Sequence, residues 1–252
     1  MISERDTMGG LAKGLGVIET FSTDRPRQSI AEVAAASGLD RATARRCLLT
    51  LAHHGYADYD GKFFTLTPRV LRLGTACLAS MPLPQIVQPA LDALSGVLGQ
   101  STSVSILDGA EIVYVARAAQ TRVMAIGLMP GSRLPAYCTS MGRVLLAALP
   151  EAEARARLGT GPLPRRTART QTDPEAILAG LAQVRERGFA LIDQEVEIGL
   201  RSLAVPVITA RGQVVAAMNV GVAAVQPKAE DLETLFLAAL LRVRDQVRPM
   251  LR

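Results

Sequence analysis

The sequence of 252 residues contains no tryptophan, three cysteines and two histidines. Cys47, Cys77 and Cys138 lie far apart and form no CxxC pair, so they predict neither a disulfide framework nor a zinc site. We therefore expect a cytoplasmic protein, since the cytoplasm keeps thiols reduced, and we expect no metal ion and no cofactor.

No histidine follows His54, and this absence limits the chemistry of the larger C-terminal part. A Ser-His-Asp or Cys-His arrangement is excluded there, and no phosphate loop or GxGxxG motif precedes a helix. His53 and His54 project about 100° apart on a helix and cannot bind one metal together. Glu195 and Glu197 leave open an enzyme with a purely acidic mechanism, and a lysine-based mechanism is also open. Our prediction is that the chain is not an enzyme.

Long apolar runs are also missing. None approaches the roughly 18–20 residues that a membrane-spanning helix needs, and the opening MISERDTMGG lacks the apolar region of a signal peptide. We therefore expect no membrane partner. Hydrophobic residues still make up 49% of the chain, enough to bury a core in one large or two ordinary domains.

The net charge of +5 favours a polyanionic partner only in a general way. Residues 1–73 hold ten Lys and Arg against eight Asp and Glu, so the positive charge is not concentrated there. The position of the charges on one helix is therefore more informative than their sum.

The first 73 residues follow the order of a winged helix-turn-helix domain. A helix around 11–21 and a turn at DRPRQ precede a second helix, IAEVAAAS, which Ser29 and Glu32 cap as a capping box. Gly38 ends that helix, and Asp40 caps the third. The strands YADY and KFFTL then meet at an Asp-Gly pair, a strong hairpin signal. Three helices and a hairpin predict a winged helix-turn-helix at 1–73.

The third helix carries an apolar stripe of Ala44, Cys47, Leu48 and Leu51 on one side and arginines on the other. The start of such a helix enters the major groove, where arginine binds guanine edges or phosphates. A helical subdomain with a solvated charged face is the structural alternative. The residues that we expect to contact DNA are Arg41, Thr43, Arg45 and Arg46 on the helix, Lys62 in the wing and Arg69 just after it.

The pattern of residues 74–100 predicts helices with a break at MPLP. We expect these helices to link the domains and to help the chain dimerise. From 101 the apolar pattern changes to period two, in STSVSIL, AEIVYVARA, VMAIGLM, FALID, RSLAVPVIT and QVVAAMNVGV. Three helices, TSMGRVLLAAL, PEAEARARL and TDPEAILAGLAQVRERG, interrupt the strands, and a last helix runs from about 227 to 250. The pattern predicts an α+β domain at 101–252, with an antiparallel sheet covered by helices.

The chain resembles the IclR family of transcriptional regulators over nearly its whole length. The resemblance rests on KGLGVIETF, SIAEVAAASGLDRATARRCLLTL, GKFFTLTPRVLRLG, RLPAYCTSMGRVLLAAL and GFALIDQEVEIGLRSLAVPV, in this order. RLPAYCTSMGRVLLA is most similar to the branch that senses aromatic and hydroaromatic acids of the β-ketoadipate pathway, such as protocatechuate or 4-hydroxybenzoate. The resemblance implies a GAF-like effector domain, dimers or dimers of dimers, and palindromic double-stranded promoter DNA as partner.

A helix start within TSMGRVLLAAL is suited to an anion. Free N–H groups of Ser140, Met141 and Gly142 would point out of this helix start, where the dipole favours a carboxylate. The hydroxyls of Thr139 and Ser140 add donors, and Gly142 lets a ligand approach closely. We therefore expect a small organic acid, aromatic or otherwise, to bind here.

The family resemblance extends this site to the strand that follows GLR. It implies that Ser202 and Ala204 lie near the effector, with Met218 as a wall on the neighbouring strand and Asp193 at an acidic position. The alternative for Met141 and Met218 is an ordinary place in the core, and Glu195 is expected either to contact ligand or to pair with Arg201. A regulator of the same build that senses a non-aromatic acid, such as glyoxylate or a sugar acid, is the main functional alternative.

Overall fold

A computed structural model describes residues 3, 6–22, 24–120, 127–225 and 228–251. The chain forms two compact units, Met1–Ala79 and Ser80–Arg252. In the described residues no single helix is long and apolar enough to cross a membrane, although the consecutive helices over 68–80 and 82–98 would together reach that length and apolarity.

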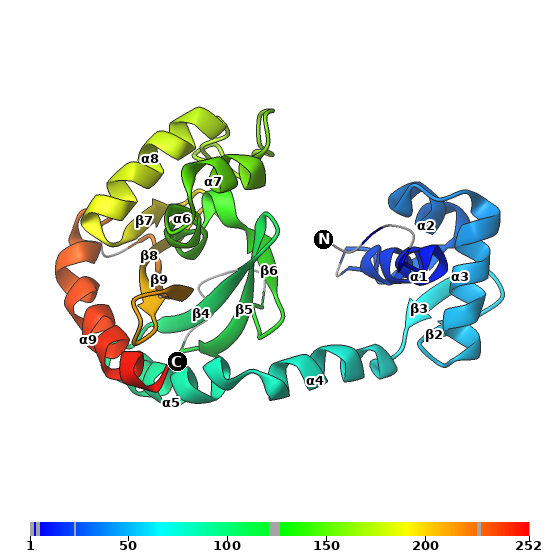
Figure 1. The fold of residues 1–252 in the computed structure, drawn as a ribbon, viewed down its shortest axis with the longest axis horizontal. Coiled ribbons are helices and arrows are strands. Elements are labelled where there is room, and N and C mark those ends of the chain that lie inside the picture. The colour runs from blue at the N-terminus through cyan, green and yellow to red at the C-terminus, as the bar shows by residue number, and fades with distance from the viewer. Residues whose placement is uncertain (1–2, 4–5, 23, 121–126, 226–227, 252) are drawn as a thin grey trace. The chain divides into compact units, whose positions relative to one another are not determined.

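The first unit is a winged helix-turn-helix, as the sequence predicts (Figure 1). Its elements are α1 (Gly9–Glu19), β1 (Arg27–Ser29), α2 (Ile30–Ser37), α3 (Arg41–His53), β2 (Ala57–Tyr59), β3 (Phe63–Leu66) and a 3-10 turn (Pro68–Val70), followed by α4 (Leu71–Ser80), whose last residue begins the second unit. Val17, Val33, Ala44, Leu48 and Phe64 are fully buried and join the three helices to the hairpin.

Local signals set the ends of these elements. Ser29 and Glu32 form the predicted capping box, and Gly38 follows α2 with a φ of 68°. The carboxylate of Asp40 accepts the Thr43 N–H at the start of α3. Within DRPRQ, however, the structure forms β1 rather than a plain turn. Its Gln28 lies opposite Phe64 and is buried, and the Gln28 amide donates to the Thr20 carbonyl.

The second unit contains a six-stranded, wholly antiparallel sheet in the order β6-β5-β4-β9-β8-β7. The strands are β4 (Ser101–Asp108), β5 (Glu111–Ala118), β6 (Arg133–Pro135), β7 (Ala190–Asp193), β8 (Leu200–Ile208) and β9 (Val214–Ala223). Its helices are α5 (Pro82–Leu98), α6 (Ser140–Ala147), α7 (Glu151–Leu158), α8 (Pro174–Arg187) and α9 (Ala238–Val247), with shorter helical turns at Ala136–Cys138, Glu233–Leu237 and Arg248–Met250.

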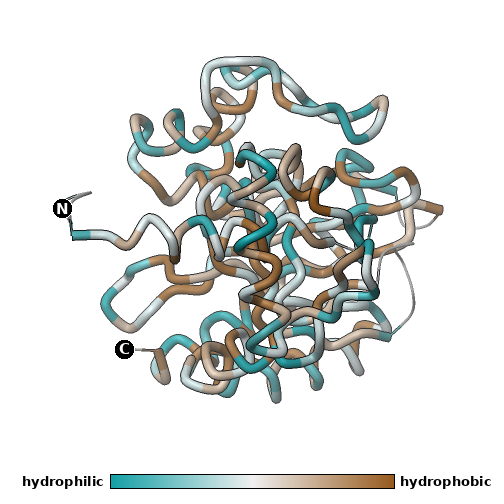
Figure 2. The backbone as a smooth tube through the Cα atoms, turned by 90° about the vertical axis from the view of Figure 1, so that its right-hand side faces the viewer, coloured by the Kyte–Doolittle hydropathy of each residue, from teal (hydrophilic) through white to brown (hydrophobic). Residues whose placement is uncertain are grey.

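Helices cover both faces of this sheet (Figure 1). On one face α5 and α9 bury Val104, Leu203 and Val220 among other strand residues, which we call the α5–α9 core. On the other face α6, α7 and α8 pack over residues that include Ala204 and Ala217, which we call the α6–α8 core. Along the helices hydrophobic and hydrophilic stretches alternate, as expected where one side of a helix is buried (Figure 2).

In three places the elements of this unit differ from the expected ones or lie outside the described residues. Most of VMAIGLM lies outside the described residues, and its last three residues, 127–129, are not in a strand. The short β6, which pairs with β5, was not predicted. The expected start of the last helix near 227 also lies outside the described residues, and the helix contains a π-helical turn at Glu233–Leu237 before α9.

Candidate nucleic-acid interface and ligand cavity

The exposed side of α3 carries three of the arginines expected to contact DNA. Arg41, Arg45 and Arg46 are exposed, whereas Ala44 and Leu48 on the opposite side are fully buried. The apolar stripe that packs the helix on its own domain therefore leaves its cationic residues to solvent.

Thr43 differs from the arginines, because it belongs to the helix cap. Only 9% of the residue is exposed, and its hydroxyl donates to Asp40 at 2.7 Å. The same contact, together with the Thr43 N–H, holds the pKa of Asp40 below its ordinary value. The Thr43 hydroxyl is therefore engaged in the cap of α3, and the expected DNA contact by this residue stays a prediction.

The wing presents a second group of cations. Lys62 is exposed, and both Lys62 and Arg27 lie over the Phe63 ring, at 5.1 and 4.2 Å from its centre. Arg27 also pairs with Asp60 at 2.5 Å. Backbone N–H groups, that of Phe63 first, and the Arg27 guanidinium keep the pKa of Asp60 far below its usual range. Arg27 was missed because β1 was not predicted, and the pairing of β1 with β3 places Arg27 beside the wing.

Arg69 lies just beyond the wing, as its place in the sequence indicates. It is exposed and its guanidinium lies 5.3 Å from the centre of the Tyr56 ring. The cations on α3, in the wing and after it are therefore all accessible to a large anion.

A small cavity of about 30 Å³ lies on the α6 side of the sheet, beside the start of α6. Its walls come from the five strands β4, β5, β6, β8 and β9, from the start of α6, and from the loops before β6 and after β7. The lining residues are Ser101, Tyr114, Arg117, Leu128, Leu134, Thr139, Ser140, Met141, Val196, Leu200, Ser202, Asn219 and Gly221. Seven of these thirteen residues have polar side chains and five have apolar ones, so the wall offers a small molecule both hydrogen-bonding groups and a hydrophobic surface.

A β-bulge brings two of these residues to the same face. Val104 lies opposite Ala116 and Ser105 opposite Tyr114, so Val115 is an extra residue in β5. In a regular strand Tyr114 and Arg117, three positions apart, would point to opposite faces. The extra residue reverses the alternation, and both line the cavity.

Three buried polar atoms around the cavity have no hydrogen-bond partner within the part of the chain that the structure describes. They are Arg117 Nε, Ser140 Oγ and Asn219 Oδ1. Leaving such an atom unpaired costs about 1–3 kcal/mol. Their convergence on one cavity therefore indicates a site that a polar ligand completes.

Arg117 is the single charged residue among the described residues of the cavity wall. Its Nη1 donates to Ser103 at 2.9 Å, and burial lowers its pKa from the ordinary arginine value. Burial also raises the pKa of Tyr114 to about 12 and that of Cys138 to about 12, so both are neutral at physiological pH. Arg117 is therefore the group in the described wall that would attract an anion.

Four residues of the expected effector site line the cavity: Thr139, Ser140, Met141 and Ser202. Their roles differ in part from the expectation. The Thr139 hydroxyl accepts the Gly142 N–H at 3.1 Å and so caps α6. The Gly142 N–H is consequently not available to a ligand, and the free donors at this helix start are reduced to the first positions of α6.

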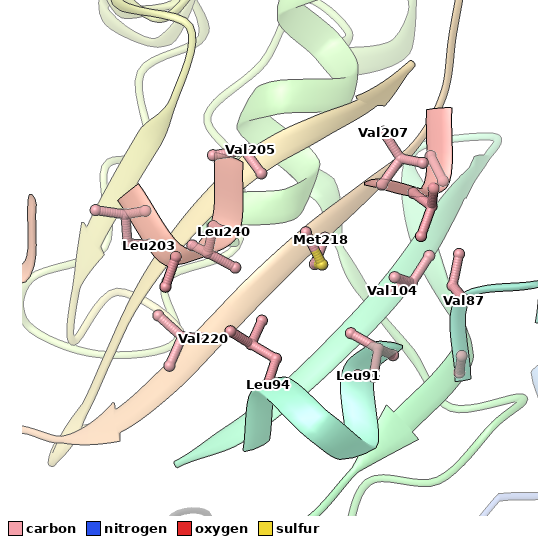
Figure 3. Close-up of a cluster of buried hydrophobic side chains, with 14 of the residues drawn as sticks. Val87, Leu91, Leu94, Val104, Leu203, Val205, Val207, Met218, Val220 and Leu240 are labelled. Carbon is pink, nitrogen blue, oxygen red and sulfur yellow. The ribbon is translucent and has the colours of Figure 1, made fainter. Parts of the chain in front are cut away.

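Met218 does not line the cavity. It is 1% exposed and belongs to the α5–α9 core, where it lies near Leu91, Val104 and Val207 (Figure 3). Side chains alternate along a strand, so the cavity face of β9 carries Asn219 and Gly221 instead. The expectation was wrong by one residue, and that is enough to change the face.

Gly142 is required by packing rather than by a ligand. A Cβ at this position would lie 2.1 Å from the carbonyl oxygen and 2.4 Å from the Cα of Ala136. Gly142 does not belong to the cavity wall either. Its lack of a side chain lets the turn at Ala136–Cys138 lie against the first turn of α6.

Asp193 and Ala204 also lie outside the wall of the cavity. Ala204 is buried in the α6–α8 core. Asp193 pairs with Arg201 at 2.6 Å and with Arg169 at 2.5 Å. The expected pair of Glu195 with Arg201 is therefore replaced, because Glu195 pairs with Arg143 at 3.4 Å.

The Arg143–Glu195 pair fixes the loop that closes one side of the cavity. Arg143 is on α6, and Glu195 precedes Val196 of the cavity wall. Burial raises the pKa of Glu195, against the opposing effect of Arg143. The Thr170 hydroxyl donates to the Glu195 carbonyl at 2.7 Å and further holds the loop.

Sequence reasoning missed Arg117 and Asn219. A lone arginine in the apolar run AEIVYVARA is a signal that could have been noticed. Its face could not be assigned, however, because the bulge in β5 depends on the pairing with β4. In the described ranges no group of three or more His, Cys, Asp or Glu is placed to hold a metal ion.

Family models match both parts of the chain. The IclR helix-turn-helix domain matches residues 10–61, and the C-terminal part of the bacterial transcriptional regulator IclR matches residues 75–248. The Pca regulon regulatory protein of Pseudomonas putida is 45% identical over 237 residues, which cover 94% of this chain and 81% of the relative.

The names of two further similar proteins refer to a hydroxybenzoate. The p-hydroxybenzoate hydroxylase transcriptional activator of Acinetobacter baylyi is 40% identical over 223 residues, 86% of this chain and 82% of the relative. A crystal structure of an IclR homologue from Microbacterium hydrocarbonoxydans, complexed with 4-hydroxybenzoate, has a TM-score of 0.72 and 26% identity and covers 95% of this chain and 99% of that one.

Proposed function

The chain belongs to the IclR family of bacterial transcriptional regulators, and from this premise we propose that it controls genes of aromatic-acid catabolism in response to a hydroxybenzoate-type acid. Residues 1–73 bind DNA, 74–100 link and help dimerise the chain, and 101–252 bind the effector. The protein acts in the cytoplasm, and effector binding, with no catalytic turnover, is its function.

The DNA partner is a palindromic promoter site bound by two copies or by a dimer of dimers. A single winged helix offers a small footprint, and two-fold related half-sites supply the missing specificity. Arg45 and Arg46 are the residues that we assign to base edges. Arg41, Lys62 and Arg69 bind phosphates, because each is exposed on α3 or near the wing.

The effector is a carboxylic acid held in the cavity at the start of α6. The observation that supports this most strongly is the group of buried polar atoms on Arg117, Ser140 and Asn219, which have no partner in the described chain. The carboxylate accepts hydrogen bonds from Ser140 and from the first N–H groups of α6. An aromatic ring suits the apolar walls from Leu134, Met141 and Val196.

Calorimetry on the full chain tests this assignment. We expect 4-hydroxybenzoate or protocatechuate to bind with a stoichiometry of one per chain, and glyoxylate and a sugar acid to bind far more weakly. Ser140→Ala should weaken binding of the aromatic acid by about 1–3 kcal/mol, because the carboxylate loses a buried donor. Thermal unfolding gives an independent measure, since saturation at about 100 times Kd adds roughly 2.7 kcal/mol.

The control is Thr160→Ala, an exposed residue after α7 that does not line the cavity, which should leave affinity unchanged. If only the aliphatic acids bind, the proposal of a ligand-responsive regulator stands, but the proposed aromatic class of effector is rejected. Equal affinities of wild type and Ser140→Ala would place the carboxylate elsewhere.

A further inference from the structure

We propose that Arg117 and Asn219 act as a pair that recognises a hydroxyl group of the effector, at the opposite end of the ligand from its carboxylate. This inference rests on the proposed effector site at the start of α6. It adds a reason why the cavity would select a hydroxy acid over an unsubstituted one.

The two residues belong to one row across three neighbouring strands. Ser103 of β4 lies directly opposite Arg117 of β5 on one side and Asn219 of β9 on the other. Neighbouring strands are about 4.8 Å apart. The Arg117 guanidinium reaches the middle strand, since its Nη1 donates to the Ser103 hydroxyl at 2.9 Å. The guanidinium therefore extends along the row in the direction of β9, which carries Asn219, and both residues line the cavity.

The unpaired atoms of this row have opposite hydrogen-bonding character. Arg117 Nε is a donor only, and Asn219 Oδ1 is an acceptor only. Neither has a partner in the described chain, so they do not bond to each other. A carboxylate would satisfy the arginine, but it could be met by Asn219 only if the amide turned over to present its N–H donors, because the oxygen now faces the unpaired position. A hydroxyl accepts from the first and donates to the second, so one group satisfies both atoms.

Ser140 supplies the other end of the site. It lies on α6, not on the sheet, and its hydroxyl is the third unpaired atom of the cavity. The residue is only 1% exposed. A carboxylate at this helix start and a hydroxyl over the β4 row together satisfy all three atoms. A ligand with a carboxylate and a ring hydroxyl fits this arrangement.

An acid without the hydroxyl would leave Asn219 Oδ1 desolvated and unpaired. A site that is built to bond a hydroxyl rejects such an analogue through this cost. We expect discrimination of roughly 5- to 150-fold in Kd, the range that one unpaired buried polar group produces.

The test is calorimetry on the full chain with benzoate, 3-hydroxybenzoate, 4-hydroxybenzoate and 4-methoxybenzoate. In wild type the better hydroxybenzoate should bind roughly 5- to 150-fold more tightly than benzoate. The methoxy acid should lose this advantage, because its oxygen accepts but cannot donate. In Asn219→Ala the ratio of hydroxybenzoate to benzoate affinity should fall towards one while benzoate still binds, which also shows that the variant is folded. Asn219→Leu, closer in volume, serves if the alanine variant does not fold.

Arg117→Gln should likewise reduce the advantage of the hydroxy acid, whereas Ser140→Ala should weaken benzoate and the hydroxy acid by the same factor. An unchanged affinity ratio in the Asn219 variants would overturn the inference and leave the proposed function intact. An equal loss of benzoate and hydroxybenzoate in Arg117→Gln would assign the carboxylate to Arg117 and reject the pair as a hydroxyl site. Failure of every aromatic acid to bind wild type would contradict the proposed effector class as well.

Discussion

Polar groups are arranged in opposite ways in two regions of the molecule. One region is the surface formed by α3 and the wing, and the other is the cavity beside α6. On the first surface, the cations are exposed and the nearby cap and turn groups are paired, as Asp40 with Thr43 and Asp60 with Arg27 show. In the cavity, the polar atoms of Arg117, Ser140 and Asn219 are buried and lack partners in the described residues. A polyanion meets accessible charges, whereas a small ligand completes bonds that the fold leaves open.

The two surfaces therefore respond differently to substitution. A change on the α3 surface alters a solvated contact and leaves the fold in place. A change at the cavity acts on packed backbone or on a buried charge. The largest effects on stability are expected around the cavity, and the smaller, sequence-dependent effects are expected on DNA.

The greatest effect should follow Gly142→Ala. The added methyl group would overlap the Ala136 backbone at 2.1 Å, so α6 or the preceding turn must move. We expect a loss of about 3 kcal/mol or more in the stability of the second unit, with effector binding abolished. Calorimetric unfolding of the full chain measures it.

Gly96→Ala on α5 is the matched control, since a Cβ there meets nothing within 4 Å. It should stabilise the helix by up to about 1 kcal/mol. Equal effects of the two substitutions would show that the start of α6 tolerates a side chain. The expectation that substitutions around the cavity have the largest effects on stability would then be wrong.

The next largest effect should follow Arg143→Met. Arg143 also donates to the Tyr137 carbonyl, and its loss leaves Glu195 buried without a cation. Both side chains retain some solvent exposure, so we expect a cost of about 2–3 kcal/mol near pH 8, below the range for a fully buried pair. Glu195→Gln should cost less, because the amide oxygen can still accept the Gln171 N–H.

The same pair gives a pH dependence whose sign follows from the raised pKa of Glu195. A carboxyl with a raised pKa takes up a proton on folding, so its contribution to stability is present at low pH and is lost as the pH rises through the raised pKa. Removing Arg143 raises that pKa further. The cost of Arg143→Met should therefore shrink between pH 8 and pH 5, as measured by urea unfolding, and a cost that grows on acidification would contradict this account.

The smallest effects are expected on DNA. Arg45→Ala or Arg46→Ala should cost roughly 1–3 kcal/mol on the cognate operator and much less on random DNA, if the residue reads a base edge. Lys62→Ala should weaken both DNAs equally and reduce the salt slope by about one. Titrations at two salt concentrations distinguish these roles. No loss for either arginine would reject α3 as the recognition surface.

Much of the first unit could be read from short-range signals. The capping box of Ser29 and Glu32, the Asp40 cap and the Gly38 stop depend on residues within four positions of one another, and the structure has all of them. The exposed face of α3 follows from a helical period that needs no partner to define it. The β1 strand was missed because it exists only through its pairing with β3.

The cavity was only partly predictable. The start of α6 and the hydroxyls of Thr139 and Ser140 are local features, and they do lie at the cavity. Met218 was assigned to the wrong face, since alternation along β9 can be started on either face until the register is known. The exchange of ion partners between Glu195 and Arg201 likewise depends on how a loop folds over α6.

Motifs and periodicity along the chain are enough to indicate the family, the winged helix-turn-helix with its caps and hairpin, and the helix start that suits an anion. These follow from motifs and from periods of 3.6 and two, which act over a few residues. The tertiary structure alone decided that Arg117, Ser103 and Asn219 form one row, because a bulge in β5 and the registers of two strand pairs set which side chains share a face. Strand register is fixed by long-range packing, and no local pattern in the chain specifies it.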